Sequence, residues 1–215
     1  MQHFREWFDL FQQELHGIDI IQGLVLIFGV SEVLLARANS IWLYPTGIVA
    51  VVLGIVSLFK VQLYAECLLH LYYLVMSIYG WWYWTSKKNE KPIEITFSSK
   101  REWTITVIIV FAGSVVLFLF LTYLTDSEVP AWDAWVSATG WAGMWLLAKR
   151  KIENWLLLNI SNAFAIPLLL NKGLPLMALL TLFLFLVACK GYYDWFQFAR
   201  KRLAEDYHGN HLHES

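Results

Sequence analysis

The chain has 215 residues, of which 58% are hydrophobic and only 15% are charged, and its net charge is −1. A soluble domain carries about 25% charged residues, so this composition excludes an ordinary soluble enzyme and is typical of a polytopic membrane protein. The absence of a basic surplus also argues against nucleic acid as a partner. Cys67 and Cys189 both fall in apolar segments and do not predict a disulfide framework.

Residues 1–16 are predicted to form an amphipathic helix that lies along the membrane interface, because Phe4, Trp7, Phe8 and Phe11 share one helical face. A membrane-spanning helix needs about 20 apolar residues. Seven later segments meet this requirement and predict seven transmembrane helices. In chain order these are Ile18–Ala36, Ile41–Phe59, Gln62–Trp84, Trp103–Thr125, Ala131–Ala148, Ile152–Leu170 and Leu174–Phe198.

The basic residues orient this predicted bundle. With seven spans the two ends of the chain fall on opposite sides, and most Lys and Arg residues gather on the side of the C-terminus. They are Arg37, Lys87, Lys88, Lys91, Lys100, Arg101, Lys149, Arg150, Lys151, Arg200, Lys201 and Arg202. The positive-inside rule therefore places the N-terminus outside and the C-terminus in the cytoplasm.

The sequence contains an internal repeat. Leu34–Arg37 recurs as Leu146–Lys149, Trp42 recurs as Trp155, and Gly80 recurs as Gly191, and the offset along the chain is nearly the same in all three cases. These markers predict two parallel three-helix units, as in transporters whose substrate site lies between the halves near the membrane midplane. The predicted divisions are an interfacial helix (1–16), a first repeat (17–86), a loop with a linking helix (87–125), a second repeat (126–198) and a cytoplasmic tail (199–215).

Enzyme signatures are absent from the sequence, which lacks His-Glu-x-x-His, Gly-x-Ser-x-Gly, a Walker loop and Gly-x-Gly-x-x-Gly. The histidines His208, His211 and His213 resemble a metal-binding tract but are read as part of a solvated tail. We therefore expect neither catalysis nor a cofactor or metal site.

Polar groups inside the membrane are candidates for function. Asn159 and Asn162 lie near one helical face with Trp155 a turn earlier. An unpartnered amide in hydrocarbon costs ~2–7 kcal/mol, so both amides require either a neighbouring helix or a bound molecule. The other such residues are Glu32, Glu66, His70, Lys190 and Asp194.

Two of these sets are spaced i, i+4 on a predicted helix. Lys190 and Asp194 are expected to form an ion pair with each other, whereas Glu66 and His70 form either a proton relay or a pair that bonds a neighbouring helix. Glu32 receives no assignment. No Arg lies within a span and Lys190 is the sole basic residue there, so we expect an unphosphorylated ligand that is neutral or cationic.

Three motifs resemble the bacterial nicotinamide riboside transporter family, called PnuC: Gln62–Ala65, Ile78–Trp84 and Ile152–Leu156. The resemblance covers nearly the whole chain. It implies an all-α membrane protein with seven core helices in a 3+1+3 parallel duplication similar to the SWEET sugar transporters. It further implies a homotrimer in the bacterial inner membrane, and facilitated diffusion with cytoplasmic phosphorylation maintaining the inward flux.

The family signature in the sixth span is similar to Trp-x-x-Trp-x-x-x-Asn/Asp. Trp155 and Asn162 occupy its ends, but Leu158 replaces the second Trp, and His70 stands where the family often has Gln or Asn. The resemblance thus implies nicotinamide riboside as the substrate, with thiamine, another flat cation, as the alternative.

In this hypothesis Trp155 and either Trp42 or Trp81 stack on the substrate ring. The amide and hydroxyl groups would be bound by Asn159, Asn162 and His70, with Ser77 and Gln62 as further candidates. Two rival hypotheses remain open: proton-coupled uptake through Glu66 and His70, and a non-transporting membrane scaffold or receptor.

Overall fold

The computed structural model describes residues 2–60, 64–86 and 94–212, and within them the side chains of residues 9–60, 67, 69–86 and 94–201. The regular structure of these residues is α-helical apart from one isolated bridge between Thr96 and Lys151. The helices are α1 (Gln2–Gly17), α2 (Ile20–Arg37), α3 (Leu43–Lys60), α4 (Tyr64–Ser86), α5 (Lys100–Leu124), α6 (Pro130–Ala148), α7 (Asn154–Asn171) and α8 (Pro175–Leu212).

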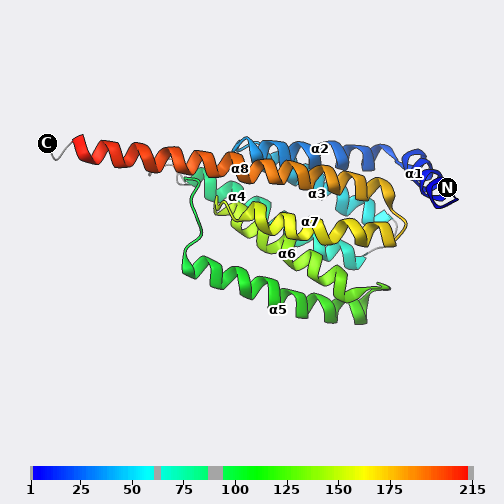
Figure 1. Ribbon diagram of the computed structural model, residues 1–215. Helices are drawn as coiled ribbons and strands as arrows, with labels where there is room; N and C mark the ends of the chain where they lie inside the picture. The colour runs from blue at the N-terminus through cyan, green and yellow to red at the C-terminus, as the bar shows by residue number, and fades with distance from the viewer. Residues whose placement is uncertain (1, 61–63, 87–93, 213–215) are drawn as a thin grey trace.

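These helices agree with the predicted interfacial helix and the seven predicted apolar segments to within a few residues at most boundaries. Local sequence explains the starts: Asp19 caps α2 by accepting from the Gln22 N–H at 2.7 Å, and Ser99 caps α5 in the same way. Pro130 and Pro175 are the first residues of α6 and α8. The exception is the end of α8, which continues as helix to Leu212 through the segment predicted as a tail (Figure 1).

Four helices in the described part of the chain are long and apolar enough to cross a membrane by composition: α2, α3, α5 and the first part of α8. The interior helices α6 and α7 are less apolar for a physical reason. Helix α6 is rich in Gly, Ala and Trp and buries much of its surface against other helices, and α7 carries asparagine within its length. Small and polar residues are favoured where membrane helices contact one another.

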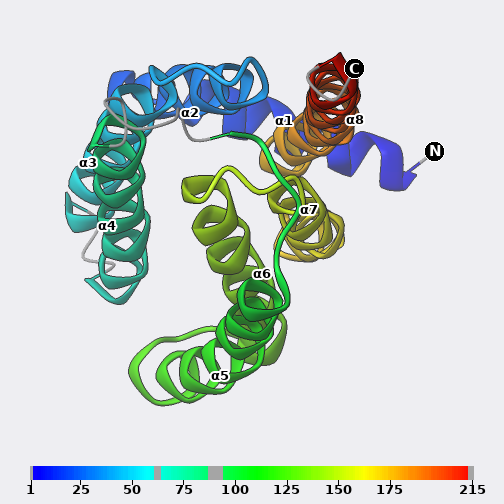
Figure 2. The same cartoon turned by 90° about the vertical axis from the view of Figure 1, so that its left-hand side faces the viewer.

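Six of the helices form a closed ring of neighbours. Helix α2 packs on α3, α3 on α4, α4 on α6, α6 on α7, α7 on α8, and α8 returns to α2. Helix α5 packs on α6 outside this ring, and α1 contacts α8 at one end (Figures 1 and 2). Much of α5 is exposed apolar surface, including Phe111, Val115 and Val116, which suits contact with lipid.

The main core lies at the end of the ring where the α2–α3 and α6–α7 turns meet. Four rings form what we call the aromatic seal: Tyr44, Trp84, Trp155 and Trp195. Tyr44 meets Trp84 edge-on at 5.1 Å, and Trp155 meets Trp195 edge-on at 5.6 Å. All four are buried, so this end of the bundle is closed.

The two halves of the seal repeat one another in a register that pairs Trp84 with Trp195. The Trp84 indole N–H donates to the Ala148 carbonyl at 3.0 Å, and the Trp195 indole N–H donates to the Arg37 carbonyl at 3.2 Å. The turns match as well: Asn39 and Arg150 have φ angles of 53° and 54°.

Counted from Trp84 and Trp195, Tyr44 and not Trp42 lies at the position equivalent to Trp155. These contacts favour a different register from the one predicted from tryptophan, and the duplication itself stays a prediction. The match of Leu34–Arg37 with Leu146–Lys149 also shifts by one position, because Ala148 occupies the place of Arg37. The physical reason is that backbone hydrogen bonds and ring contacts fix equivalence, whereas apolar residue types recur by chance in membrane helices.

Candidate functional site

A cavity of about 450 Å³ opens at the end of the ring opposite the aromatic seal. We call it the entrance cavity. Its walls come from the starts of α2 and α8, the end of α3 and the last turn of α1, and His70 of α4 lies on its lining. Small-molecule sites commonly measure about 300–1,000 Å³, so the space suits a vitamin-sized ligand. The lining is mostly apolar, including Val25, Leu26, Leu58 and Met177.

Helix α1 forms one rim of the entrance cavity. Its Glu14 accepts a hydrogen bond at 2.6 Å from the backbone N–H of Leu176, in the first turn of α8. A carboxylate at a helix N-terminus satisfies an otherwise orphaned N–H and complements the helix dipole. The predicted interfacial helix is therefore tied to the bundle at the cavity.

Inside the ring, α4 meets α6 through aromatic side chains. The Tyr72 ring stacks on Trp141 at 4.4 Å, and its hydroxyl donates to the Trp141 carbonyl at 3.0 Å. Next to this contact Tyr73 lies against Gly140, where an added Cβ would stand 3.3 Å from the Tyr73 hydroxyl. His70 meets Tyr73 edge-on at 6.1 Å, so an aromatic path leads from the cavity lining into the interior.

Four residues of the first half bring polar groups to this interior: Glu32, Tyr44, Tyr73 and Ser77. We call them the central polar cluster. Ser77 is 0% exposed, and neither its Oγ nor the Tyr44 hydroxyl has a hydrogen-bond partner among the described residues. The Glu32 carboxyl group lies against Gly47 of α3, and the Tyr73 hydroxyl lies against Gly140 of α6. Sequence reasoning named Ser77 but missed the two tyrosines and left Glu32 unassigned.

The predicted residues of α7 lie at different depths. Trp155 is 0% exposed and packs under Gly191, where an added Cβ would come within 2.7 Å of the indole ring. Asn159 and Asn162 are half-buried, and Leu158 fills the space above Gly143. The Asn159 amide faces α8: in the orientation that satisfies both groups it donates to the Phe185 carbonyl at 3.1 Å and accepts from the Cys189 N–H at 3.3 Å.

Of the other predicted residues, His70 and Ser77 face the interior, whereas Trp42 and Trp81 lie outward with exposures of 65% and 41%. The structure therefore does not bring either tryptophan against Trp155. Gln62 and the side chain of Glu66 lie outside the described residues. The Glu66–His70 relay thus remains a prediction.

The expected ion pair between Lys190 and Asp194 is wrong. Asp194 bonds instead to Arg37 of α2, with 2.7 Å between Nε and Oδ2, and Lys190 is exposed. This pair joins the end of α2 to the middle of α8 beside the aromatic seal. Asp194 could not be assigned from the sequence because its partner lies 157 residues away.

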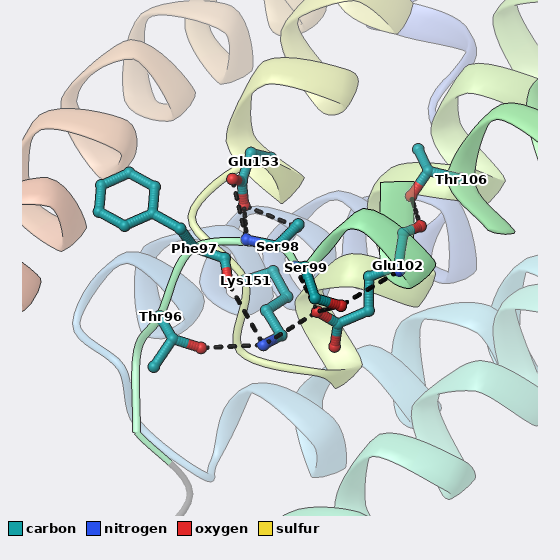
Figure 3. Close-up of polar contacts among 8 residues, drawn as sticks. All are labelled: Thr96, Phe97, Ser98, Ser99, Glu102, Thr106, Lys151 and Glu153. Carbon is teal, nitrogen blue, oxygen red and sulfur yellow. Dashed lines mark hydrogen bonds and ion pairs between the residues drawn. The ribbon is translucent and has the colours of Figure 1, made fainter. Parts of the chain in front are cut away.

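A loop contact holds the α6–α7 turn, and with it the start of α7 (Figure 3). The Glu153 carboxylate accepts from the Ser98 N–H at 2.9 Å and from the Ser98 hydroxyl at 2.7 Å. Lys151 Nζ donates to Thr96 Oγ1 at 2.9 Å and lies 3.2 Å from the Glu102 carboxylate. Thr96 also exchanges backbone hydrogen bonds with the turn. The segment before α5 is thereby clamped to the turn that precedes Trp155.

We expect Glu153→Ala to lower the free energy of unfolding by about 1–3 kcal/mol, because it leaves the Ser98 donors without their charged acceptor. Thermal unfolding of the detergent-solubilised protein measures this loss. Glu128→Ala is the matched control, since Glu128 is exposed and the substitution is expected to change stability little. Equal melting temperatures for the two variants would contradict the clamp.

The electrostatics of the closed end come from the same turn. The Arg150 guanidinium lies 3.7 Å from the centre of the Trp84 ring, and burial lowers the pKa of Arg150. Lys149 Nζ lies 4.3 Å from the Tyr83 ring. These cations cover the seal from outside. No group of three or more His, Cys, Asp or Glu residues that could hold a metal occurs in the part of the chain that the structure describes.

Comparison with known proteins gives concordant results. Residues 19–197 match the family model described as nicotinamide mononucleotide transporter. The nicotinamide riboside transporters PnuC of Escherichia coli (strain K12) and of Shigella flexneri are each 27% identical to this chain, over 86% of it and 90% of theirs. A crystal structure described as the vitamin B3 transporter PnuC superimposes with a TM-score of 0.68, covers 92% of this chain and 90% of its own, and is 20% identical.

Proposed function

Because the chain belongs to the nicotinamide mononucleotide transporter family, we propose that it takes up nicotinamide riboside across the bacterial inner membrane. It is a multi-pass membrane transporter and not an enzyme. The observation that carries the choice of substrate is the interior of the ring, which offers tyrosines, hydroxyls and one carboxyl group. The related PnuC proteins named for nicotinamide riboside support the same choice.

The unphosphorylated riboside suits this interior better than the mononucleotide that gives the family its description. A phosphate group requires Arg, Lys or a helix N-terminus. At the closed end Arg37, Lys149 and Arg150 engage Asp194, Tyr83 and Trp84. Lys151 and Lys172, which flank α7, pair with Glu102 and Asp133, and Lys60 at the end of α3 is exposed. Lys190 is exposed and does not serve the interior. The described part of the ring interior contains no Arg or Lys to bind a phosphate.

The finer architecture is part of this proposal. We propose seven spans in a 3+1+3 parallel duplication, with α2–α4 and α6–α8 as the repeats and α5 as the linking helix. Two observations support it: Trp84 and Trp195 make equivalent hydrogen bonds to the ends of α6 and α2, and Asn39 and Arg150 have matching φ angles. With the N-terminus outside, the entrance cavity faces the exterior and the aromatic seal closes the cytoplasmic side.

The substrate site is proposed to lie between the two halves, further from the entrance cavity than His70. The residues proposed from the sequence are Trp155, Asn159, Asn162, His70, Ser77, Trp42, Trp81, Gln62 and Leu158. His70 and Ser77 have the most direct structural support, because they line the cavity and the interior. Transport is proposed to occur by facilitated diffusion with metabolic trapping and in a homotrimer, and thiamine is the second candidate substrate.

Uptake into proteoliposomes tests the function. We expect radiolabelled nicotinamide riboside to equilibrate across the membrane, nicotinamide mononucleotide to be excluded, and an imposed pH gradient to produce no accumulation above equilibrium. Empty liposomes are the control. Thiamine uptake without riboside uptake would transfer the assignment to the second candidate. Binding of a vitamin without flux would favour the receptor hypothesis and contradict transport.

A further inference from the structure

The central polar cluster contains a half-buried acidic residue, Glu32, to which no role has been given. Glu32 lies on α2, one side of which faces Gly47 of α3. A Cβ on Gly47 would collide with the Glu32 carboxyl group, with Oε2 at 2.9 Å. The absence of a side chain at position 47 therefore creates the space that the Glu32 carboxyl group occupies.

The same place in the second half is built without polar groups. In the register that pairs Trp84 with Trp195, Glu32 corresponds to Gly143 and Gly47 to Leu158. There too the glycine makes room for the facing side chain, because a Cβ on Gly143 would lie 2.8 Å from Leu158. The contact of Glu32 with Gly47 in the first half is thus matched by the contact of Leu158 with Gly143 in the second half. The side chain that fills the space is acidic in one half and aliphatic in the other.

The remaining members of the cluster follow this pattern. Tyr44 corresponds to Trp155, and Ser77 corresponds to Ala188, which is also buried. At the positions of Glu32, Gly47 and Ser77 the second half has Gly143, Leu158 and Ala188. Packing at these positions therefore does not require a carboxyl group or a serine hydroxyl. A half-buried carboxyl group and two buried hydroxyls without hydrogen-bond partners among the described residues are costly in a membrane interior. The second half has neither a carboxyl group nor a hydroxyl at the equivalent positions, and this difference indicates a ligand in the first half.

We propose that Glu32, together with the rings of Tyr44 and Tyr73, recognises a permanent positive charge on the substrate ring. This inference rests on the proposed function and deepens it. The pyridinium ring of nicotinamide riboside and the thiazolium ring of thiamine both carry such a charge. The unpartnered hydroxyls of Ser77 and Tyr44 are then available to the polar arm that both molecules carry.

The physical basis is charge complementarity in a medium of low dielectric constant. A carboxylate attracts a cation far more strongly there than in water, and the faces of tyrosine rings add a cation–π contribution. The cluster lies deeper than the entrance cavity: Leu26 of α2 and Gly54 of α3 line the cavity, and Glu32 and Gly47 lie about two helical turns further along the same helices. At a rise of about 1.5 Å per residue this is roughly 10 Å. A cation would meet the carboxyl group only after passing His70.

The test compares nicotinamide riboside with its reduced 1,4-dihydro form, which keeps the sugar and amide but has no charge on the ring. Both are assayed in proteoliposomes with the wild-type protein and with Glu32→Gln. We expect Glu32→Gln to lower riboside uptake by at least about tenfold, while uptake of the neutral form stays within about twofold of wild type. Equal uptake of the riboside by both proteins, or an equal loss of both substrates, would overturn the inference.

Gly47→Ala provides a second route if Glu32→Gln does not fold. The added methyl group meets the end of a flexible side chain, so the protein is expected to fold while the carboxyl group is displaced. Gly29→Ala on α2 is the control, because a Cβ there has no neighbour within 4 Å. Preference for the charged form should fall in Gly47→Ala and persist in Gly29→Ala; an unchanged preference in both would overturn the role of Glu32. If the wild-type protein transports neither substrate, the proposed function itself fails.

Discussion

Gly191→Ala is expected to lower the yield of folded protein in the membrane to a small fraction of the wild-type yield. An added Cβ would stand 2.7–2.8 Å from three ring atoms of Trp155, and the indole cannot move aside because Trp195 packs against it. Overpacking of a well-packed core costs about 1–3 kcal/mol and sometimes more. Trp155 of α7 and Trp195 of α8 both belong to the aromatic seal. The clash should therefore separate α7 from α8 at the closed end.

Folded yield, measured by size-exclusion chromatography of a fluorescent fusion, reports this effect. Gly29→Ala introduces the same methyl group into a transmembrane helix where nothing lies within 4 Å, and it should leave the yield unchanged or raise it slightly. Gly80→Ala should behave like Gly191→Ala, because its Cβ would collide with the Tyr44 ring. A normal profile for Gly191→Ala would mean that the packing at the seal is looser than described.

Trp155→Ala is expected to destabilise the protein by about 3–5 kcal/mol, the range found when a large buried aromatic residue is truncated. Trp155 is fully buried and meets Trp195 edge-on, so its removal leaves a cavity in the main core. Trp42→Ala is the matched control. Its side chain is 65% exposed, and its truncation should change the melting temperature little.

This pair of variants also separates two roles of Trp155. If the indole serves only to stack on the substrate ring, Trp155→Ala will keep the wild-type melting temperature and lose uptake. The packing predicts instead that Trp155→Ala lowers the melting temperature. Trp155→Phe retains part of the ring and should recover part of the lost stability, which a stacking role alone would not require.

The ring of helices is closed at one end by the aromatic seal and is accessible at the other end through the entrance cavity. Opening the closed end requires the rings to separate and the Trp84 and Trp195 hydrogen bonds to break. Because these bonds join α4 to the last residue of α6 and α8 to the last residue of α2, they hold helices α2–α4 against helices α6–α8. The seal is therefore where a movement between the halves would be controlled.

Much of the fold was accessible from sequence because each helix is specified locally. Apolar runs predicted most of the helix boundaries to within a few residues. The structure gives a local reason for four of the starts: Asp19 and Ser99 are caps, and Pro130 and Pro175 are first residues. The family was likewise recognisable from short motifs such as Glu153–Trp155. The resemblance implied that Trp155 stacks on the substrate ring and gave Glu153 no role. In the structure Glu153 anchors the preceding loop and Trp155 is part of the core.

The candidate site was only partly accessible, because burial and partners depend on the other helices. Trp42 and Trp155 look alike in sequence, yet one is mostly exposed and the other fully buried. Lys190 and Asp194 have the spacing of an ion pair, but Arg37 lies closer to Asp194 in space. The Asn159 amide forms hydrogen bonds with the backbone of α8. Periodicity shows which residues share a helix face and does not show what that face meets.

The sequence by itself determined that this is an all-helical membrane transporter of its family, since hydrophobicity, capping and motifs are properties of local segments. Only the tertiary structure decided the hydrogen-bond partners of Trp84 and Trp195, the closed and open ends of the ring, and the position of Glu32 beside Gly47. Those properties depend on contacts between residues far apart in the chain, such as Trp195 with Arg37. Packing in three dimensions, and not residue type, selects them.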